Sequence, residues 1–273
     1  MNPIYQLENY DGANLAIYDN GNNSKPVIFF IHGNSLSGSI FHKQFTDPAL
    51  SGYRLISFDL PGHGLSRKSN VPEKVYTLEG MTRTVSHVIK SLQIQGGIAA
   101  GFSLGAHLLM QNKDTANLFD GVVLFGYPPV SSIADLMVAG TPTPALPLLM
   151  QPTLSSEETD IILNEMKVTR EREQFAALMA MTDAKFRPTL FGSLGSSVIH
   201  DELPVIHSFK NKVAYIHFEH DVFVREAYVQ EKKIPNLWRG GPQQIKSAGH
   251  CGFHQESAMF NTLLLAYTGE ILP

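Results

Sequence analysis

Hydrophobic residues in this chain gather in short runs that polar and glycine-containing segments separate. The runs at 27–31 and 97–102 are apolar throughout, as in strands that are covered on both faces of a sheet. The run at 14–19 instead alternates apolar and polar positions, as a half-buried strand does. The sequence therefore predicts strands at residues 14–19, 27–31, 53–58, 97–102, 121–126, 212–218 and 243–246.

Between these strands the apolar residues recur at helical spacing. In the segment 77–92 they fall on one face of a helix, and further helices are expected at 104–110, 225–232 and 255–267. Strands that alternate with helices need crossover connections, which produce a mainly parallel sheet. The pattern is interrupted at residues 130–207.

Residues 130–207 contain no convincing series of strands. Prolines divide 141–147, a helix begins behind the capping box formed by Ser155 and Glu158, and a second helix is expected at about 171–182. These helices are rich in Met and Leu, a composition more typical of helix packing than of ligand contacts. We therefore predict a helical cap insertion at 130–207 in an α/β core made of residues 1–129 and 208–273.

Composition and charge exclude several classes of protein. The 273 residues, 43% of them hydrophobic, can bury a large core. A net charge of −4 without a dense run of Lys and Arg argues against nucleic acid and membrane partners. No apolar run reaches the length of a membrane span and residues 1–8 do not read as a signal peptide, so we expect a cytoplasmic protein, a monomer or a homodimer. The single cysteine, Cys251, rules out an internal disulfide and fits a reducing compartment.

The segment Gly101-Phe102-Ser103-Leu104-Gly105 carries the strongest chemical signal. It fits the Gly-x-Ser-x-Gly pattern, in which a serine stands on a sharp turn between a strand and a helix. Such a turn brings the backbone so close to neighbouring chain that a Cβ atom at either glycine would clash. The sequence therefore predicts that Ser103 is a nucleophile.

A serine nucleophile of this kind is followed in the chain by an acid after a later strand and then by a histidine near the C-terminus. Asp221 and His250 both lie just beyond a predicted strand, and the carboxyl ends of parallel strands meet at one edge of the sheet. His250 would act as general base, and the carboxylate would fix its tautomer and stabilise its cationic form. Glu219 would point the same way as Asp221 in an extended segment and is the alternative acid, but Asp221 lies further into the loop.

Other histidines compete for the role of base. His217 lies within a strand and is expected in the core, and His254 opens a helix, where we expect an exposed structural role. His63 lies in a glycine turn beside Asp59, a pair that we interpret as shaping the loop. Only His250 combines the required position with a preceding glycine that frees the backbone.

The oxyanion of a tetrahedral intermediate needs two backbone N–H donors. Leu104, directly after the nucleophile, is the candidate for one, and Asn34, in the loop after the strand at 27–31, is the candidate for the other. The Asn34 side chain either contacts the substrate or only shapes the turn. We place Asn34 and Phe102 among the substrate-binding residues.

No sequence pattern supports a metal ion or a cofactor. Metal-dependent opening of an ester or lactone needs clustered ligands such as His-x-His-x-Asp-His or His-Glu-x-x-His, and neither occurs. His217 and His220 near Asp221 are a weak imitation of such a cluster. The glycine motifs of nucleotide-binding proteins are also absent, so we expect neither a metal nor a cofactor, and we interpret Cys251 as a small buried residue.

With these motifs the chain resembles the α/β-hydrolase fold family over essentially its whole length. The resemblance implies a mainly parallel eight-stranded sheet with helices on both faces and a helical cap formed by the insertion. It rests on His32-Gly33, Asp59-Leu60-Pro61-Gly62-His63-Gly64, Gly101-Phe102-Ser103-Leu104-Gly105, Asp221 and Gly249-His250.

Within that family the chain is similar to the N-acyl homoserine lactonases. In that group the acid of the triad stands just before a Phe-Val pair, as Asp221 stands before Phe223-Val224, which favours Asp221 over Glu219. The group has Trp after the first glycine of the elbow, where this chain has Phe102, and its cap is less similar. The similarity also rests on His32-Gly33-Asn34-Ser35, Ser37-Gly38-Ser39-Ile40-Phe41, Asn236-Leu237-Trp238 and Ala248-Gly249-His250.

These features predict a metal-independent serine hydrolase that acts on a small-molecule ester or lactone with an apolar acyl part, with N-acyl homoserine lactones as the sharpest expectation. A general carboxylesterase or a carbon–carbon bond hydrolase could use the same triad. A non-catalytic small-ligand receptor on a hydrolase scaffold is the alternative of another class. Haloalkane dehalogenases and epoxide hydrolases of this fold place Asp at the elbow, so Ser103 argues against both groups.

Overall fold

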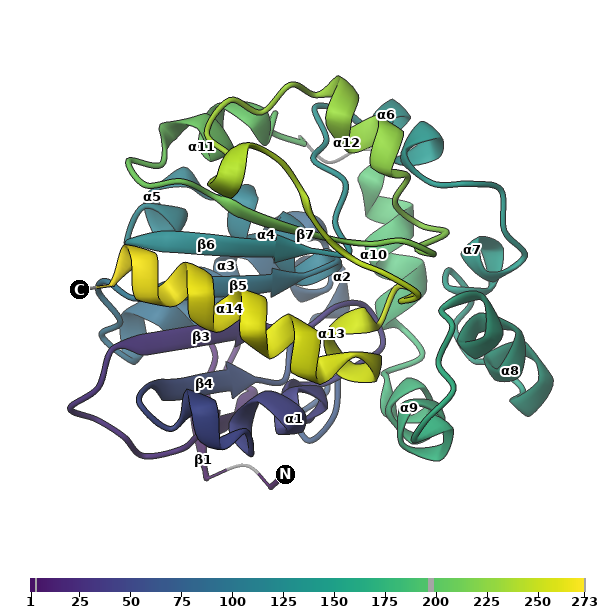
Figure 1. Cartoon of the computed structure of the whole chain (residues 1–273). Coiled ribbons are helices and arrows are strands. Elements are labelled where there is room, and N and C mark those ends of the chain that lie inside the picture. The colour runs from purple at the N-terminus through teal and green to yellow at the C-terminus, as the bar shows by residue number, and fades with distance from the viewer. Residues whose placement is uncertain (3, 196–198, 273) are drawn as a thin grey trace.

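The computed structural model describes residues 1–2, 4–195 and 199–272. Its strands are β1 (Tyr5–Glu8), β2 (Asn14–Asp19), β3 (Val27–Ile31), β4 (Arg54–Phe58), β5 (Ile98–Phe102), β6 (Gly121–Phe125), β7 (Ala214–Phe218) and β8 (Gln243–Ile245). They form one eight-stranded sheet in the order β1-β2-β4-β3-β5-β6-β7-β8 (Figure 1). Strands β3 to β8 are parallel to one another, and β1 and β2 are antiparallel at one edge.

This sheet confirms the predicted fold class, and each predicted strand is present with only small shifts of its ends. Strand β1 was not predicted from the sequence. It lies at the edge of the sheet, pairs only with β2, and turns every second side chain to solvent. Only Tyr5 and Leu7 of this strand pack against the core, so it leaves a weak hydrophobic pattern.

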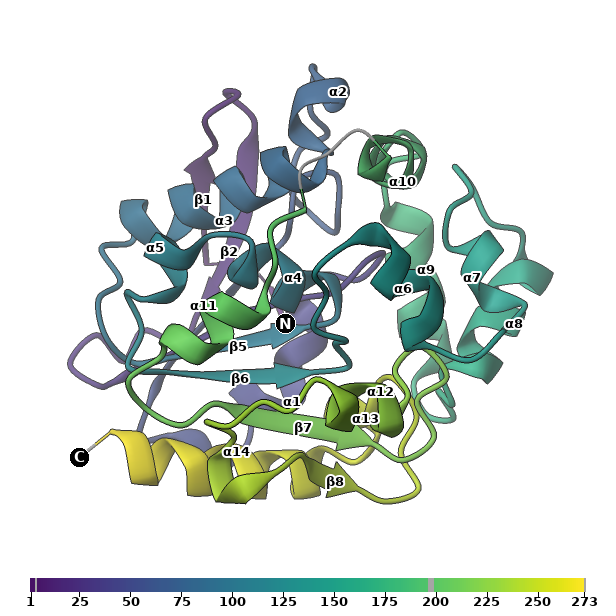
Figure 2. The same ribbon diagram turned by 90° about the horizontal axis from the view of Figure 1, so that it is seen from above.

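Helices cover both faces of the sheet. Helices α3 (Leu78–Ser91), α4 (Leu104–Met110) and α5 (Lys113–Ala116) lie on one face, and α1 (His42–Phe45) and α14 (Ser257–Ile271) lie on the other (Figures 1 and 2). Each face has its own hydrophobic core. The remaining short elements of this part of the chain are η1 (Gly38–Phe41), η2 (Pro48–Leu50), α2 (Pro72–Val75), α12 (Glu226–Glu231), η3 (Trp238–Gly240) and α13 (Gly252–Gln255). Among the described helices, none combines the length and apolar character that a membrane crossing requires.

Between β6 and β7 the described residues form helices and no strand, as predicted. These helices are α6 (Ile133–Ala139), α7 (Ala145–Leu148), α8 (Ser156–Glu165), α9 (Arg172–Met181), α10 (Phe186–Leu194) and α11 (Leu203–Ser208). Helices α7 to α10 lie beyond the carboxyl ends of the parallel strands (Figure 1). The predicted capping box of α8 is present, because the Ser155 hydroxyl accepts the Glu158 N–H at 3.1 Å and the Glu158 carboxylate accepts the Ser155 N–H at 2.8 Å.

The C-terminal region differs from the prediction of one helix at 255–267. Two helices meet at Glu256, where φ is −118° and ψ is 47°. Helix α13 passes so close to the sheet that a Cβ on Gly252 would lie 2.3 Å from the Phe218 ring. His254, expected to be exposed, is fully buried on this helix, so that prediction is wrong. Cys251 is buried, as predicted.

Candidate active site

Ser103 stands at the turn between β5 and α4 with backbone angles of φ 49° and ψ −119°. Residues other than glycine avoid positive φ, and holding one there costs on the order of 1–3 kcal/mol. The flanking glycines make the turn possible. A Cβ at Gly101 would lie 2.6 Å from Cα of Ala106, and one at Gly105 would lie 2.3 Å from the carbonyl oxygen of Ile31. The strand, tight turn and helix therefore follow in the order that the sequence predicts.

The loop after β3 lies against Ser103. A Cβ at Gly33 would lie 3.1 Å from the Ser103 Cβ and 2.9 Å from the Phe102 ring. Asn34 follows Gly33 and lines the same cavity as Ser103. Leu104 is the first residue of α4, and the first N–H groups of a helix have no carbonyl within that helix to receive them. Asn34 and Leu104 thus both border Ser103, and the N–H of Leu104 can serve a ligand.

A buried hydrogen bond joins His250 and Asp221. Nδ1 of His250 lies 2.8 Å from Oδ2 of Asp221, and the two side chains are only 5% and 1% exposed. Oδ1 of Asp221 accepts the backbone N–H of Phe223 at 2.9 Å, which orients the carboxylate. An Nδ1–H that donates to Asp221 leaves Nε2 of His250 as the basic atom.

Glu219, the alternative acid, is directed elsewhere. Its carboxylate accepts the backbone N–H of Ser247 at 2.7 Å and lies beside His220. Its side chain is 37% exposed, in contrast to the buried carboxylate of Asp221. Of the two acids, Asp221 is therefore the one that the fold brings to His250.

Aromatic rings hold the His250 imidazole in place. The ring centroids of Phe102 and Phe223 lie 4.9 Å and 4.8 Å from that of His250. Gly126 leaves room for this packing, because a Cβ there would lie 2.7 Å from the Phe102 ring and 3.1 Å from Cε1 of His250. Phe102 was predicted as a substrate-binding residue. It lines the cavity and also packs against the candidate base.

Ser103 and His250 line a cavity of about 640 Å³. This volume lies in the range of pockets that enclose small organic ligands. Asn34, Phe102 and Leu104 also line the cavity. Asp221 does not line it and lies behind His250, to which it is hydrogen-bonded. Much of the remaining wall consists of apolar side chains between β6 and β7, namely Ile133, Leu136, Met137, Leu146, Leu149, Met150, Met166, Leu190, Phe191 and Leu194. Interpreting the Met and Leu residues of this segment as helix packing was therefore only partly right.

A buried arginine connects α10 to the loop that carries Asn34. Nε of Arg187 donates to the Ser35 hydroxyl at 2.8 Å, and Ser35 donates to the Asn34 side-chain oxygen at 2.7 Å. Burial lowers the pKa of the guanidinium to about 10. Its remaining N–H groups donate to the carbonyl oxygens of Gln151, Pro152 and Met179. The orientation of the Asn34 side chain thus depends on a residue for which the sequence contains no motif.

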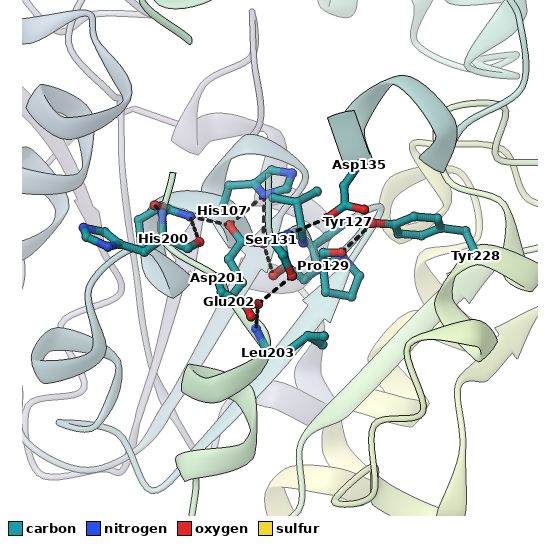
Figure 3. A network of polar contacts seen from close by, with 12 residues as sticks. His107, Tyr127, Pro129, Ser131, Asp135, His200, Asp201, Glu202, Leu203 and Tyr228 are labelled. Atoms are coloured by element: carbon teal, nitrogen blue, oxygen red, sulfur yellow. Dashed lines mark hydrogen bonds and ion pairs between the residues drawn. The ribbon is translucent and has the colours of Figure 1, made fainter. Parts of the chain in front are cut away.

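A second imidazole–carboxylate pair lies in the cavity wall (Figure 3). Nδ1 of His107, on α4, lies 2.9 Å from Oε1 of the fully buried Glu202. Gln111, the Tyr127 hydroxyl and the Val130 N–H also donate to this carboxylate. Burial and the nearby Glu202 carboxylate raise the pKa of Tyr127. Sequence reasoning missed this pair, because Glu202 belongs to no motif and the only sign of His107 was its place one helical turn after Ser103.

Two further histidines accept hydrogen bonds from backbone N–H groups in the loops around the site. Nε2 of His32 accepts the Leu60 N–H at 2.9 Å, and Nε2 of His63 accepts the Ser35 N–H at 3.2 Å. Burial lowers the pKa of His32 to about 4 and that of His63 well below its usual value. Both rings are therefore neutral acceptors for loop N–H groups, and His63 shapes the loop as predicted.

Among the described residues, one group of side chains has the spacing of a metal site. His42, Glu171 and His254 bring their ligand atoms within 4.8 Å of one another. The surroundings do not suit a cation, because Nζ of Lys43 lies 2.9 Å from the Glu171 carboxylate. The Gln255 amide also donates to Nδ1 of His254 at 3.0 Å, which leaves the proton on Nε2, facing Glu171. The Gln255 amide is fixed in this orientation because its oxygen accepts the N–H groups of Thr169 and Arg170. We therefore interpret Glu171, directly before α9, as the partner of Lys43 in an ion pair that joins this helix to the core.

The chain is similar to known proteins along nearly its whole length. Residues 28–262 match the model of the Alpha/beta hydrolase family. A curated relative, the AB hydrolase superfamily protein YisY of Bacillus subtilis, is 23% identical, and the match covers 97% of this chain and 99% of YisY. Among solved structures, N-acyl homoserine lactonase AidH complexed with N-butanoyl homoserine has a TM-score of 0.90 and 25% identity over 98% of this chain and 97% of AidH. A thermophilic esterase from Thermogutta terrifontis has a TM-score of 0.76 and 14% identity over 98% and 99% of the two chains.

We predict that the backbone of Ser103 stores strain that glycine relieves. Ser103→Gly should exceed Ser103→Ala in free energy of unfolding by about 1 kcal/mol, because only glycine adopts the positive φ without a steric penalty. Urea denaturation of the two variants measures the difference. An alanine variant as stable as the glycine variant, or more so, would show that the turn is not strained.

We also predict that acid destabilises the fold partly through His32. Its pKa is about 4 when folded against 6.5 for an unperturbed histidine, so the stability that neutral His32 contributes is present above pH 6.5 and is lost as the pH falls toward 4. At pH 5 this loss is about 2 kcal/mol. His32→Gln should be less stable at pH 7.5, but its stability should fall about 2 kcal/mol less than that of the wild type between pH 7.5 and 5. Urea denaturation at both pH values tests this, and equal decreases in the two proteins would contradict it.

Proposed function

The chain belongs to the alpha/beta hydrolase family, and from that premise we propose that it is a serine hydrolase of small esters or lactones with an apolar acyl part. N-acyl homoserine lactones are the substrates that we expect it to hydrolyse best. The observation that carries the proposal is the buried hydrogen bond between Asp221 and His250. It lies at the wall of an apolar cavity that the strained Ser103 also lines.

In the proposed mechanism, Oγ of Ser103 attacks the substrate carbonyl carbon while Nε2 of His250 takes the hydroxyl proton. Asp221 holds the Nδ1–H tautomer of His250 and stabilises the imidazolium that forms. When the tetrahedral intermediate collapses, His250 returns the proton to the leaving oxygen, which in a lactone is the ring oxygen. A water molecule, deprotonated by His250, then hydrolyses the acyl ester on Ser103. No step requires a metal ion.

The proposed oxyanion site consists of the backbone N–H groups of Leu104 and Asn34. The N–H of Leu104 has the added support of the α4 helix, whose partial positive charge at the N-terminus favours a developing anion. Removing one donor from such a site slows catalysis roughly 10²- to 10³-fold in a serine protease. The hydrogen-bond chain from Arg187 through Ser35 to Asn34 would keep the second donor in register.

The helices at 130–207 would act as a cap on a core made of residues 1–129 and 208–273. Much of the apolar wall of the cavity comes from this segment, and we propose that these side chains hold the acyl chain by burying it. The group at Glu171 and the contact of Arg187 with Ser35 would tie this cap to the core at two points. Such a cap excludes water from the acyl chain and leaves the scissile carbonyl at Ser103.

The likeness to AidH supports the lactone as substrate. Solved AidH complexes contain N-butanoyl homoserine and N-hexanoyl homoserine lactone, and the match covers nearly the full length of both chains. A cavity of about 640 Å³ has room for acyl groups of this size.

A general carboxylesterase is the second candidate. The likeness to the esterase from Thermogutta terrifontis favours it, and an open-chain ester needs the same three catalytic groups as a lactone.

We predict that Ser103→Ala and His250→Gln each abolish hydrolysis while the proteins stay folded. The expected loss in kcat is roughly 10⁶-fold for either variant and roughly 10⁴-fold for Asp221→Asn, by analogy with a serine protease. The assay compares N-hexanoyl homoserine lactone with p-nitrophenyl butyrate and hexanoate, in the presence of EDTA. Glu219→Gln is the matched control, because it removes the neighbouring carboxylate that faces Ser247, and its activity should stay near that of the wild type.

Higher turnover of the lactone than of the simple esters would support the lactonase, and turnover of the esters alone would support the carboxylesterase. An active, folded Ser103→Ala protein would contradict the proposed nucleophile. No turnover of any of the three compounds by the wild type would overturn the hydrolase proposal.

A further inference from the structure

The cavity wall contains few groups that can ionise. Within the part of the chain that the structure describes, His250, His107 and Glu202 are the only ionisable side chains in a largely apolar lining. His250 belongs to the proposed triad. The pair formed by His107 and Glu202 has no role in the mechanism above, although a fully buried carboxylate is costly unless it is well satisfied.

The contacts of Glu202 determine where the protons lie. The Val130 N–H donates to Oε2 at 3.0 Å, and the Tyr127 hydroxyl donates to the same oxygen at 2.5 Å (Figure 3). Gln111 donates its amide to Oε1 at 2.9 Å, and the orientation of this amide is fixed because its oxygen accepts the His200 N–H. Glu202 therefore acts as an acceptor, and the proton between it and His107 belongs to Nδ1 of the imidazole.

This tautomer leaves Nε2 of His107 as an acceptor. The ring is held on two sides, by Glu202 at Nδ1 and by the Tyr127 ring at a centroid distance of 4.6 Å. Among the described residues, no group forms a hydrogen bond with Nε2. The atom is not one of their buried polar atoms without a partner, so it is at least partly exposed. His107 is 14% exposed at its side chain and lines the cavity, so Nε2 is accessible from the cavity.

The position of His107 brings this acceptor close to the substrate bond that Ser103 would cleave. His107 lies on α4 four residues after Ser103, the residue that precedes the helix, and its backbone N–H donates to the Ser103 carbonyl at 3.3 Å. Four residues of helical rise separate the two positions by roughly 6 Å, and both residues line the cavity. A substrate carbonyl at Ser103 would therefore place the atoms next to that carbonyl within reach of Nε2.

We propose that His107, oriented by Glu202, is a specificity-determining residue that accepts a hydrogen bond from an N–H on the acyl side of the substrate. The inference rests on the proposed hydrolase function and narrows its substrate class to esters and lactones that carry an acylamino group on the carbon next to the scissile carbonyl. A site built around a polar group in an apolar wall discriminates against analogues that leave the group unpaired.

The test compares two pairs of substrates that differ only in this N–H. One pair is N-hexanoyl homoserine lactone and its carbon analogue, in which CH₂ replaces the amide N–H. The other is the methyl ester of N-hexanoylglycine and its carbon analogue. Each kcat/KM is divided by the rate constant for hydrolysis by hydroxide, which corrects for the different reactivity of the carbonyls.

The wild type should prefer the N–H compound about tenfold in at least one pair, the value of one hydrogen bond. His107→Phe should reduce this ratio to about one. His107→Gln should retain a preference of several-fold, because the amide can donate to Glu202 and still present an oxygen to the cavity. A merely structural role for His107 would lower the activity toward both members of a pair and leave their ratio unchanged.

A wild type that hydrolyses these compounds without preference for the N–H would overturn the inference while leaving the proposed hydrolase intact. A His107→Phe variant that keeps the wild-type ratio would overturn it as well. A wild type that hydrolyses none of the four compounds would refute both the substrate class and the inference.

Discussion

The tight turn between β5 and α4 is the constraint on which the rest of the site depends. Its backbone angles at Ser103 are unfavourable for a serine, and the chain on either side is so close that Gly101 and Gly105 have no room for a side chain. Gly33, in the loop after the neighbouring strand β3, also has no room for a side chain, because a Cβ there would collide with Phe102 and Ser103. Three glycines thus bring a strand, a helix and a loop to within contact of one serine, and the parallel sheet holds them there.

Hydrogen bonds of two buried charged side chains, Arg187 and Glu202, hold the inserted segment against the core. Arg187 carries its charge into the interior and contacts the loop of Asn34. Glu202 accepts hydrogen bonds from His107 on α4, from Gln111 directly after that helix, and from Tyr127 and Val130 after β6. Arg187 and Glu202 each form hydrogen bonds with segments that are distant from them in the sequence. Because an unpaired buried charge is far more costly than a paired one, such contacts fix the insertion against the core while the apolar cavity remains between them.

The sequence was most informative where one local pattern suffices. The apolar runs predicted the strands, and the capping box at Ser155 predicted the start of α8. The glycine spacing around Ser103, together with the positions of Asp221 and His250 after later strands, predicted a site that the fold assembles at one edge of the sheet. Asp221 was preferred to Glu219 because it lies further into the loop and because it stands before Phe223-Val224, as the acid does in the N-acyl homoserine lactonases that the chain resembles.

Contacts between distant segments could not be predicted in this way. His254 was expected on the surface because it opens a helix, but that helix packs against β7 at Gly252 and buries it. Glu202 and Arg187 have ordinary helical or loop surroundings in the sequence, and only the folded chain supplies their partners. The edge strand β1 was missed because half of its side chains face solvent.

Covalent labelling with a fluorophosphonate tests the central claim most directly, because this reagent reacts with a serine that a neighbouring base activates. Peptide mapping of the labelled protein should find the adduct on Ser103, and His250→Gln should slow labelling by several orders of magnitude. An adduct on another residue, or labelling of Ser103 at the wild-type rate in His250→Gln, would contradict a nucleophile activated by the His250–Asp221 pair.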